Sequence, residues 1–453
     1  MENLENQTPP SKQDQYNQDL FTFIQNSPTP FHAAANMAER LEQNGFQRLR
    51  EQDVWNLAVN HRYYVMRNNS SIIAFAIGGR MPWETGINLA GAHTDSPCLK
   101  VKPLPEKNFN STIRLAVEVY GGALLNTWFD RRLNLAGRVT CFVENHGEPG
   151  SDRLASFLIN FNRPVGVIPS LAIHLDREAN TRRSVNPQVD MAPLFYLDGA
   201  SNKASFKQIL FDQAVKEHPK AGIRKIVDFD MGFSSISPPC YTGLNRDFIT
   251  GPALDNLLSC HAGMRSLMAA DTRKTAMLVC TDHEEIGSDS SAGARGSFLT
   301  SILARITKTP EQAGRTAAKS VMISWDNAHA AHPSHGEKHD ANHLPRLNKG
   351  PVLKVNAALK YASDSESSAL FKTLCARANT PWQTFVMRSD MPCGSTTGPL
   401  ISSRTGIKTV DAGAPSLAMH SICELTGAQD PYMVFQVTRE LFAMEEQPLL
   451  SLT

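Results

Sequence analysis

The chain has 453 residues, of which 41% are hydrophobic and 20% charged, and its net charge at pH 7 is +1. This length exceeds one ordinary hydrophobic core and predicts two domains, while the composition is that of a soluble globular protein. A net charge so near zero gives no electrostatic reason to bind nucleic acid or a membrane, and neither partner is expected.

The first 20 residues are polar and lack the basic and apolar regions of a secretory signal. No run of about 18 apolar residues predicts a membrane span. The eight cysteines are scattered without a Cys-x-x-Cys pair. Such usage suits reduced thiols and argues against a disulfide framework or a cysteine-based zinc site, so we expect a cytoplasmic protein.

The N-terminal quarter predicts an arm, a helical segment and strands. Residues up to about Gln18 are expected to form a flexible arm. Apolar residues then recur at helical spacing from about 20 to 44, with an interruption at Ser27-Pro28-Thr29-Pro30. Strand-like apolar runs follow at 63–66, 71–77 and 87–92.

The pattern of apolar and polar residues changes between residues 97 and 239. Short alternating runs at 113–120, 138–143 and 166–174 are separated by Gly and Pro, with one clear helical pattern at 205–215. We interpret this part as a β-rich domain inserted into an α/β domain made of residues 1–96 and 240–453.

The α/β texture resumes after residue 239. It predicts helices at 254–270, 297–306, 365–378 and 432–445, strands at 276–280, 321–325, 383–387 and 407–410, and a break at 412–415.

Four of the predicted strands end in side chains that can bind a metal or move a proton. The strand ends carry His93-Thr94-Asp95, Asp282-His283-Glu284-Glu285, Asp326-Asn327-Ala328-His329 and Ser389–Ser395. In an open α/β sheet, ligands bind at the carboxyl ends of the strands. A single strand that ends in such residues carries little information, whereas four such strands indicate a shared site.

Glu284 and Glu285 are adjacent carboxylates, and like charges a few Å apart resist double ionisation unless a cation or a shared proton intervenes. A division of labour resolves this conflict: one Glu coordinates a metal, and the other moves protons to and from a metal-bound water. A solvated acidic loop is the ordinary alternative for an isolated Glu-Glu pair.

Four further residues extend this site, although each has an ordinary structural explanation alone. His93 and His420 are compatible with structural histidines, and Asp255 with an acid in the first turn of a helix. With Asp326 and Glu285 they form a set of two imidazoles and three carboxylates that suits Zn²⁺, Mn²⁺ or Co²⁺. The three carboxylates and a bridging hydroxide balance two divalent ions about 3.5 to 4 Å apart.

Several motifs together resemble the aspartyl aminopeptidase family of dinuclear metallopeptidases, in family order over about residues 20 to 440. The segments that carry the resemblance are Gly91–Leu99, Tyr120–Gly122, Thr127–Arg131, Leu135–Arg138, Leu254–Asn256, Asp282–Glu285, Asp326–Ala330, Lys349–Asn356 and Leu417–Ile422.

The resemblance implies a mixed-sheet, zinc-dependent exopeptidase fold with an inserted dimerisation domain. It assigns His93 and Asp326 to one metal, Glu285 and His420 to the other, and Asp255 to a bridging position. By the same resemblance, Glu284 is the general base that takes the proton of the bridging water and delivers it to the leaving amine. Two zinc ions are expected, with Mn²⁺ or Co²⁺ as alternatives.

The family resemblance also implies the substrate and the assembly. His174, His329, Lys354 and Tyr361 match positions that contact substrate, and Lys354 is suited to select an acidic first residue, Asp and then Glu. Dimers of such chains assemble into a dodecamer, and the position of His174 reaches the substrate of the neighbouring subunit. Alternation over 171–175 predicts that His174 lies opposite an apolar strand face.

Two positions depart from the family pattern: Asn327 stands where Met is usual, and Cys423 where Arg is usual. Neither is a predicted ligand. Beyond His329, a run of histidines is interpreted as loop and interface material or as a metal-binding tract; it comprises His332, His335, His339 and His343.

Two alternative functions remain open. A non-catalytic self-assembling or cargo protein could retain this fold, but the complete ligand set with Glu284 favours an enzyme. The second alternative is a dinuclear peptidase with another substrate specificity. Lys354 is the residue that distinguishes it from a peptidase specific for acidic residues.

Overall fold

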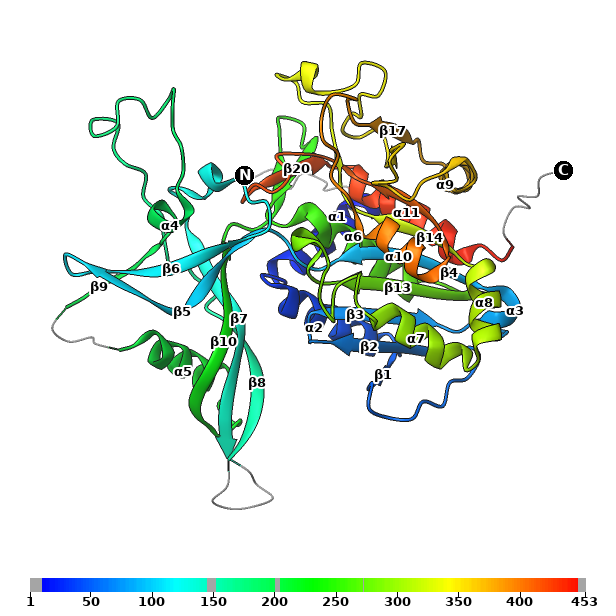
Figure 1. Ribbon diagram of the computed structural model, residues 1–453, viewed down its shortest axis with the longest axis horizontal. Helices are drawn as coiled ribbons and strands as arrows, with labels where there is room; N and C mark the ends of the chain where they lie inside the picture. Colours follow the sequence, from blue (N-terminus) through cyan, green and yellow to red (C-terminus); the bar gives the residue numbers. More distant parts are fainter. Residues whose placement is uncertain (1–9, 145–151, 200–203, 272, 447–453) are drawn as a thin grey trace, which may run out of the picture.

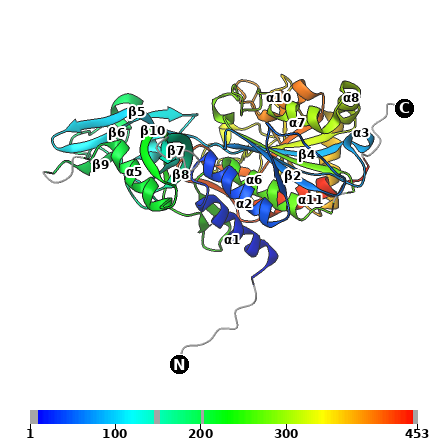
Figure 2. The same cartoon turned by 90° about the horizontal axis from the view of Figure 1, so that it is seen from below.

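A computed structural model describes residues 10–144, 152–199, 204–271 and 273–446. Two parts lie side by side in Figures 1 and 2: a larger part with a sheet between helices, and a smaller β-rich part. No helix within those ranges is long and apolar enough to cross a membrane.

The larger part is built on a mixed sheet whose central strands β13, β4, β14 and β18 are parallel neighbours. In the described residues, its strands in spatial order are β1 (Gln47–Leu49), β2 (Arg62–Arg67), β3 (Ser71–Ala76), β13 (Thr275–Thr281), β4 (Ile87–His93), β14 (Val321–Trp325), β18 (Lys408–Gly413), β16 (Val352–Val355) and β17 (Gln383–Val386).

Helices cover both faces of this sheet (Figure 2). One face packs against α1 (Lys12–Gln25), α2 (Pro30–Gln43), α6 (Leu254–Met268), α9 (Ser365–Arg377) and α11 (Asp430–Ala443). On the other side lie α3 (Pro82–Thr85), α7 (Phe298–Thr307), α8 (Pro310–Ala318) and α10 (Thr397–Thr405).

Strand β13 shows why the sheet is covered on both sides. Leu278 and Cys280 belong to the core cluster shared with α6, whereas Met277 and Val279 belong to the cluster shared with α7. Successive side chains alternate between the faces of a strand, and a parallel strand that is apolar on both must be buried on both. The continuous apolar run before Glu284 therefore places its carboxyl end inside the molecule.

The expectation of a flexible arm up to Gln18 is wrong from Lys12 onward, and residues 1–9 lie outside the described ranges. Helix α1 is capped by Ser11, whose hydroxyl accepts the Asp14 N–H at 3.0 Å. The amide of Asn17 is buried and donates to the Ala428 carbonyl at 2.8 Å. The polar composition of this segment gave no sign that side chains on one face of the helix are buried against the rest of the protein.

The smaller part contains an antiparallel sheet formed entirely by residues between 98 and 235. Its strands, as far as the chain is described, run in the order β8 (Asp152–Asn160), β7 (Leu133–Glu144), β10 (Ile223–Ser235), β5 (Cys98–Phe109), β6 (Thr112–Tyr120) and β9 (Leu194–Leu197). Helix α5 (Phe206–Glu217) packs against it, in a core cluster separate from those of the larger sheet.

The strand predicted at 166–174 does not form. Only isolated bridges occur at 166–168, and residues 173–175 lie in a turn before the short helix α4 (Pro187–Asp190). Leu171, Ile173 and Leu175 are 58%, 47% and 74% exposed, so they make no buried face opposite His174. Alternation alone did not distinguish a half-buried strand from an exposed turn.

A third sheet joins the two parts. Its described strands are β11 (Cys240–Thr242), β12 (Phe248–Gly251), β20 (Glu424–Gly427), β19 (Pro415–Leu417) and β15 (Ala328–His329). The predicted break at 412–415 is shorter than expected, because β18 continues to Gly413 and β19 begins at Pro415.

Candidate metal centre

Carboxylate and imidazole side chains converge where three neighbouring strands end. His93 is the last residue of β4, and Asp326 directly follows β14. Glu284 and Glu285 lie in the short 3-10 helix η2 (Glu284–Ile286) after β13. Since β13, β4 and β14 are parallel neighbours, their carboxyl ends meet at one edge of the sheet.

Asp255 and His420 reach this edge from the third sheet. Asp255 opens α6 after β12, and His420 follows β19. Neither residue has regular backbone geometry, because Asp255 has a non-helical φ of −85° and ψ of 102°, and His420 has a φ of 67°. Their positions therefore depend on contacts made by their loops.

The two oxygens of Asp255 face different histidines. His93 Nε2 lies 3.5 Å from Asp255 Oδ1, and His420 Nε2 lies 3.8 Å from Asp255 Oδ2. On the outer sides, His93 Nε2 is 4.0 Å from Asp326 Oδ1, and His420 Nε2 is 3.3 Å from Glu285 Oε2. This geometry yields two three-residue groups with Asp255 in both.

Metal-ligating atoms of each group lie within 4.8 Å of one another. The groups among the described residues are His93 with Asp255 and Asp326, Asp255 with Glu285 and His420, and a third of His93 with Glu284 and Glu285.

The electrostatics of the cluster call for cations. Burial raises the pKa of Glu284 to about 8, with Asp326 and Glu285 adding to the shift and His93 opposing it. Burial also raises the pKa of Asp326 to about 6, against the opposite effect of Lys354. Oδ1 of Asp255 and Oε1 of Glu285 are buried without a hydrogen-bond partner. Crowded, buried carboxylates with unpartnered oxygens fit metal ions, and the mixture of imidazole and carboxylate fits zinc.

A carboxylate to which the sequence assigned no role holds this cluster in place. Asp95 is fully buried and accepts the N–H of Glu284 and that of Glu285, both at 3.1 Å. The hydroxyl of Tyr120 donates to Asp95 at 2.6 Å, and the backbone carbonyl of Asp95 lies 3.0 Å from Nδ1 of His93. Its place two residues after His93, at a strand end, is the signal that could have revealed it.

A cavity adjoins the cluster and contains three of the four predicted substrate residues. His329, Lys354 and Tyr361 line it together with Asp255, Glu284, Asp326 and His420. Lys354 is only 4% exposed, and its Nζ lies 3.6 Å from Oδ1 of Asp326. Asn327, two residues after the end of β14, also lines the cavity, and both polar atoms of its side-chain amide are buried without a partner.

His174 lies elsewhere in the chain. It is exposed in the turn that precedes α4 and does not line this cavity. In Figure 1 the region of α4 stands apart from β4, β13 and β14. The chain on its own therefore does not bring His174 to the cluster.

The run of histidines interpreted as loop material or as a metal-binding tract lies in a loop that follows His329. The His332 N–H donates to His339 Nε2 at 3.0 Å, and His343 contacts Asp340 at 2.7 Å. Across the described ranges, none of the three groupings of metal-ligating atoms includes His332, His335, His339 or His343.

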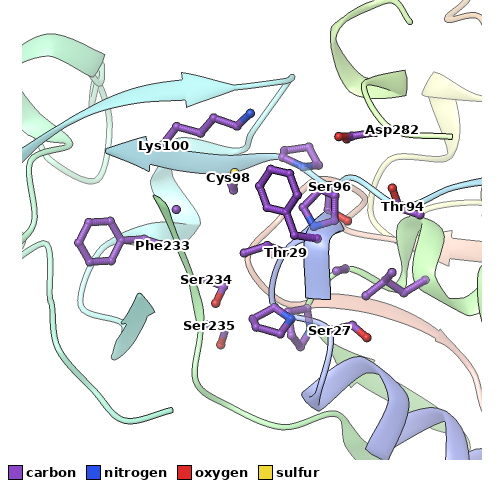
Figure 3. A pocket seen from close by; sticks show the side chains of 18 of the residues that line it. Ser27, Thr29, Thr94, Ser96, Cys98, Lys100, Phe233, Ser234, Ser235 and Asp282 are labelled. Atoms are coloured by element: carbon purple, nitrogen blue, oxygen red, sulfur yellow. The ribbon is translucent and has the colours of Figure 1, made fainter. Parts of the chain in front are cut away.

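A second cavity lies behind the cluster, between the α1–α2 turn, strands β5 and β10, and the end of β4 (Figure 3). Ser96 lines it, and its hydroxyl donates to the Asp255 carbonyl at 2.7 Å. Glu424 lines it as well. No predicted metal ligand or substrate residue lines this second cavity.

Helices on both faces of a mixed sheet, with a His and carboxylate cluster at the strand ends, define the fold of a zinc-dependent exopeptidase. The chain belongs to the family described as aminopeptidase I zinc metalloprotease (M18), whose model matches residues 23–442. The family resemblance drawn from the motifs is thus confirmed.

Individual relatives agree with this assignment. The chain is 48% identical over 434 residues to a protein of Azotobacter vinelandii named probable M18 family aminopeptidase 2, covering 96% of this chain and 99% of the other. It resembles Ape4 in the cryo-EM structure of the Ape4 and Nbr1 complex, with 35% identity, a TM-score of 0.90, and coverage of 95% and 86%. The mApe1 dodecamer of S. cerevisiae matches with 27% identity, a TM-score of 0.80, and coverage of 95% and 96%.

Proposed function

We propose that this protein is a metalloaminopeptidase that removes N-terminal Asp, and then Glu, from peptides through a dinuclear metal centre. The observation that carries the proposal is the placement of Asp255, whose two oxygens face His93 and His420, beside a cavity that contains Lys354. Membership of the zinc metalloprotease family supports the reaction class.

In this proposal His93 and Asp326 hold one ion, Glu285 and His420 hold the other, and Asp255 is shared. Zinc is the expected metal, with Mn²⁺ or Co²⁺ as alternatives for the same donors. Bound there, the two ions would polarise the carbonyl of the scissile peptide bond and lower the pKa of a water molecule.

Glu284 is proposed as the proton carrier rather than a ligand. Its side chain lines the substrate cavity, whereas Glu285 does not and instead lies 3.3 Å from His420. A pKa raised by burial to about 8 suits a group that takes a proton and gives it up near neutral pH. Glu284 then transfers the proton of the attacking water to the leaving amine.

Lys354 is proposed to select the acidic side chain. Its ammonium group is buried beside Asp326, whose carboxylate would be shared with a metal in the loaded enzyme. A substrate carboxylate would supply the matching charge, whereas an apolar side chain would leave the ammonium without it. His329 and Tyr361 line the same cavity and are proposed to contact the substrate.

We further propose a homo-oligomer, a dodecamer built from dimers, with the β-rich part of 97–239 at the dimer interface. The dodecameric state of mApe1 supports this assembly. The exposure of His174, away from its own cavity, supports a role at the site of a neighbouring subunit. All eight cysteines are free thiols, in keeping with a cytoplasmic location.

The rival proposal is a non-catalytic assembly or cargo protein. It has less support, because a protein without catalytic activity would need neither the clustered ligands nor Glu284. Metal analysis combined with a panel of aminoacyl chromogenic substrates tests the choice. We expect two zinc ions per chain and cleavage of aspartyl and glutamyl substrates well above leucyl. A protein that binds no metal and cleaves none of them would contradict the proposal.

A further inference from the structure

Glu424 links the two loops that bring Asp255 and His420 to the cluster. It is the first residue of β20 and only 2% exposed. Its Oε2 accepts the N–H of Asp255 at 2.8 Å, and its Oε1 accepts the N–H of His420 at 2.8 Å. One carboxylate therefore connects the backbones of two candidate ligands that are 165 residues apart in the chain (420 − 255).

The third sheet explains how Glu424 comes to lie between these loops. Strand β20 pairs with β12 on one side and with β19 on the other. β12 leads into Asp255, and β19 leads into His420. A carboxylate at the start of the middle strand is therefore close to the loop that leaves each neighbour.

Both loops need such a contact, because neither ligand has regular backbone geometry. Among the described residues, Glu424 is the only side chain that accepts a hydrogen bond from the N–H of Asp255 or of His420. A buried N–H that loses its acceptor is destabilised, so the pair of bonds opposes movement of either loop.

We propose that Glu424 is a positioning residue that sets the spacing of Asp255 and His420 and thereby the affinity for the ion held by Asp255, Glu285 and His420. This inference rests on the proposed dinuclear function. Glu424 is not itself a candidate ligand, since each of its oxygens accepts an N–H and it belongs to none of the metal-ligating groups in the described residues.

The effect should be unequal for the two ions. His93 and Asp326 lie at the ends of β4 and β14, whose parallel register fixes them without Glu424. Only Asp255 in their group depends on Glu424, whereas both Asp255 and His420 depend on it in the other group.

Glu424→Gln tests the proposal, because it keeps the shape of the side chain but replaces one acceptor oxygen with an NH₂ donor that faces an N–H. Zinc affinity is measured by competition with a chelator and by metal analysis, without any turnover. Loss of an outer hydrogen-bond partner typically weakens metal binding by about 10- to 100-fold. We expect that loss for one of two zinc equivalents and a much smaller change for the other.

Asp430→Asn is the matched control. Asp430 is also fully buried and accepts two backbone N–H groups, from Asn348 at 2.7 Å and Gly350 at 3.3 Å, neither of them in the cluster. Its replacement should lower the melting temperature and leave both zinc affinities unchanged. The proposal is overturned if Glu424→Gln leaves both affinities at the wild-type value, weakens both equally, or changes them no more than Asp430→Asn does.

Ser96→Ala provides a milder second variant that remains informative if Glu424→Gln does not fold. Ser96 borders the cavity in Figure 3, and within the described part of the chain its hydroxyl bonds only the carbonyl of Asp255, so a smaller loss at the same zinc equivalent is expected. Unchanged zinc affinity in this variant would then count against positioning through Asp255. A wild-type protein that binds fewer than two zinc ions would instead overturn the dinuclear function itself.

Discussion

Glu284 and Glu285 are chain neighbours with different surroundings. Both backbone N–H groups bond to Asp95, which holds the pair in one orientation. From this common anchor the Glu284 side chain reaches the cavity that Lys354 also lines, while that of Glu285 reaches His420. The two carboxylates therefore have different surroundings, as the proposed division of labour between them requires.

Glu284→Gln should abolish turnover while the metals stay bound. The amide keeps the shape of the side chain but accepts no proton, and loss of a general base lowers kcat by about 10² to 10⁴. Steady-state kinetics and metal analysis on the same sample measure the two effects. Glu285→Gln is the neighbouring control and should lose metal. A Glu284→Gln enzyme with near-normal kcat would show that the proton carrier is another group.

Lys354→Leu should lose acidic substrates selectively. Breaking one side of a buried charged pair costs about 3 to 5 kcal/mol, and a leucyl substrate never used that pair. The ratio of kcat/KM for aspartyl and leucyl substrates is the measurement, with the leucyl substrate as internal control. Equal losses on both would identify Lys354 as a structural partner of Asp326.

At the scale of elements, the sequence predicted the sheet strands and the residues at their ends more accurately than the residues that hold those ends. Apolar runs identify buried strands, so His93, Glu284 and Asp326 could be placed together before any coordinates. Glu424 could not be given its role, because no local pattern tells which carboxylate accepts a distant backbone N–H. Asp95 is marked in the sequence only by its place two residues after His93. The prediction of a strand up to His174 was wrong for a related reason. Alternation of apolar and polar residues does not show whether other parts of the protein cover the apolar side.

Helix α1 offers a test of the element that composition concealed. Leu20 is fully buried in the main core, whereas Gln18, two residues earlier, is exposed. Leu20→Ala should lower the free energy of unfolding by about 2 to 5 kcal/mol. Gln18→Ala should change it by less than about 0.5 kcal/mol. Denaturant titrations compare the two, and a neutral Leu20→Ala would mean that this segment does not pack in solution.

At the scale of the whole molecule, activity should require at least a dimer, because the cavity within one chain lacks His174. We expect His174→Ala to be folded, metal-loaded and nearly inactive. Mixing it with an excess of inactive Glu284→Gln under conditions that exchange subunits should restore activity, since a mixed pair can contain one site with both residues intact.

Two controls accompany the mixing experiment. Each variant is incubated alone under the same exchange conditions, and mixed dimers are verified by mass spectrometry of a tagged pair. No recovery despite verified mixed dimers would leave His174 as a residue of its own subunit's structure.

The connection of β4 to β13 has a consequence for synthesis of the chain on the ribosome. His93 pairs in register with Thr281, so the central strands cannot join until the β-rich part between them has been made. That part has a core cluster of its own and can begin to fold first. Since β20 and His420 come from the last tenth of the chain, the candidate metal centre can be completed only when translation is nearly finished. A prematurely terminated chain would therefore lack both His420 and the carboxylate of Glu424 that contacts its loop.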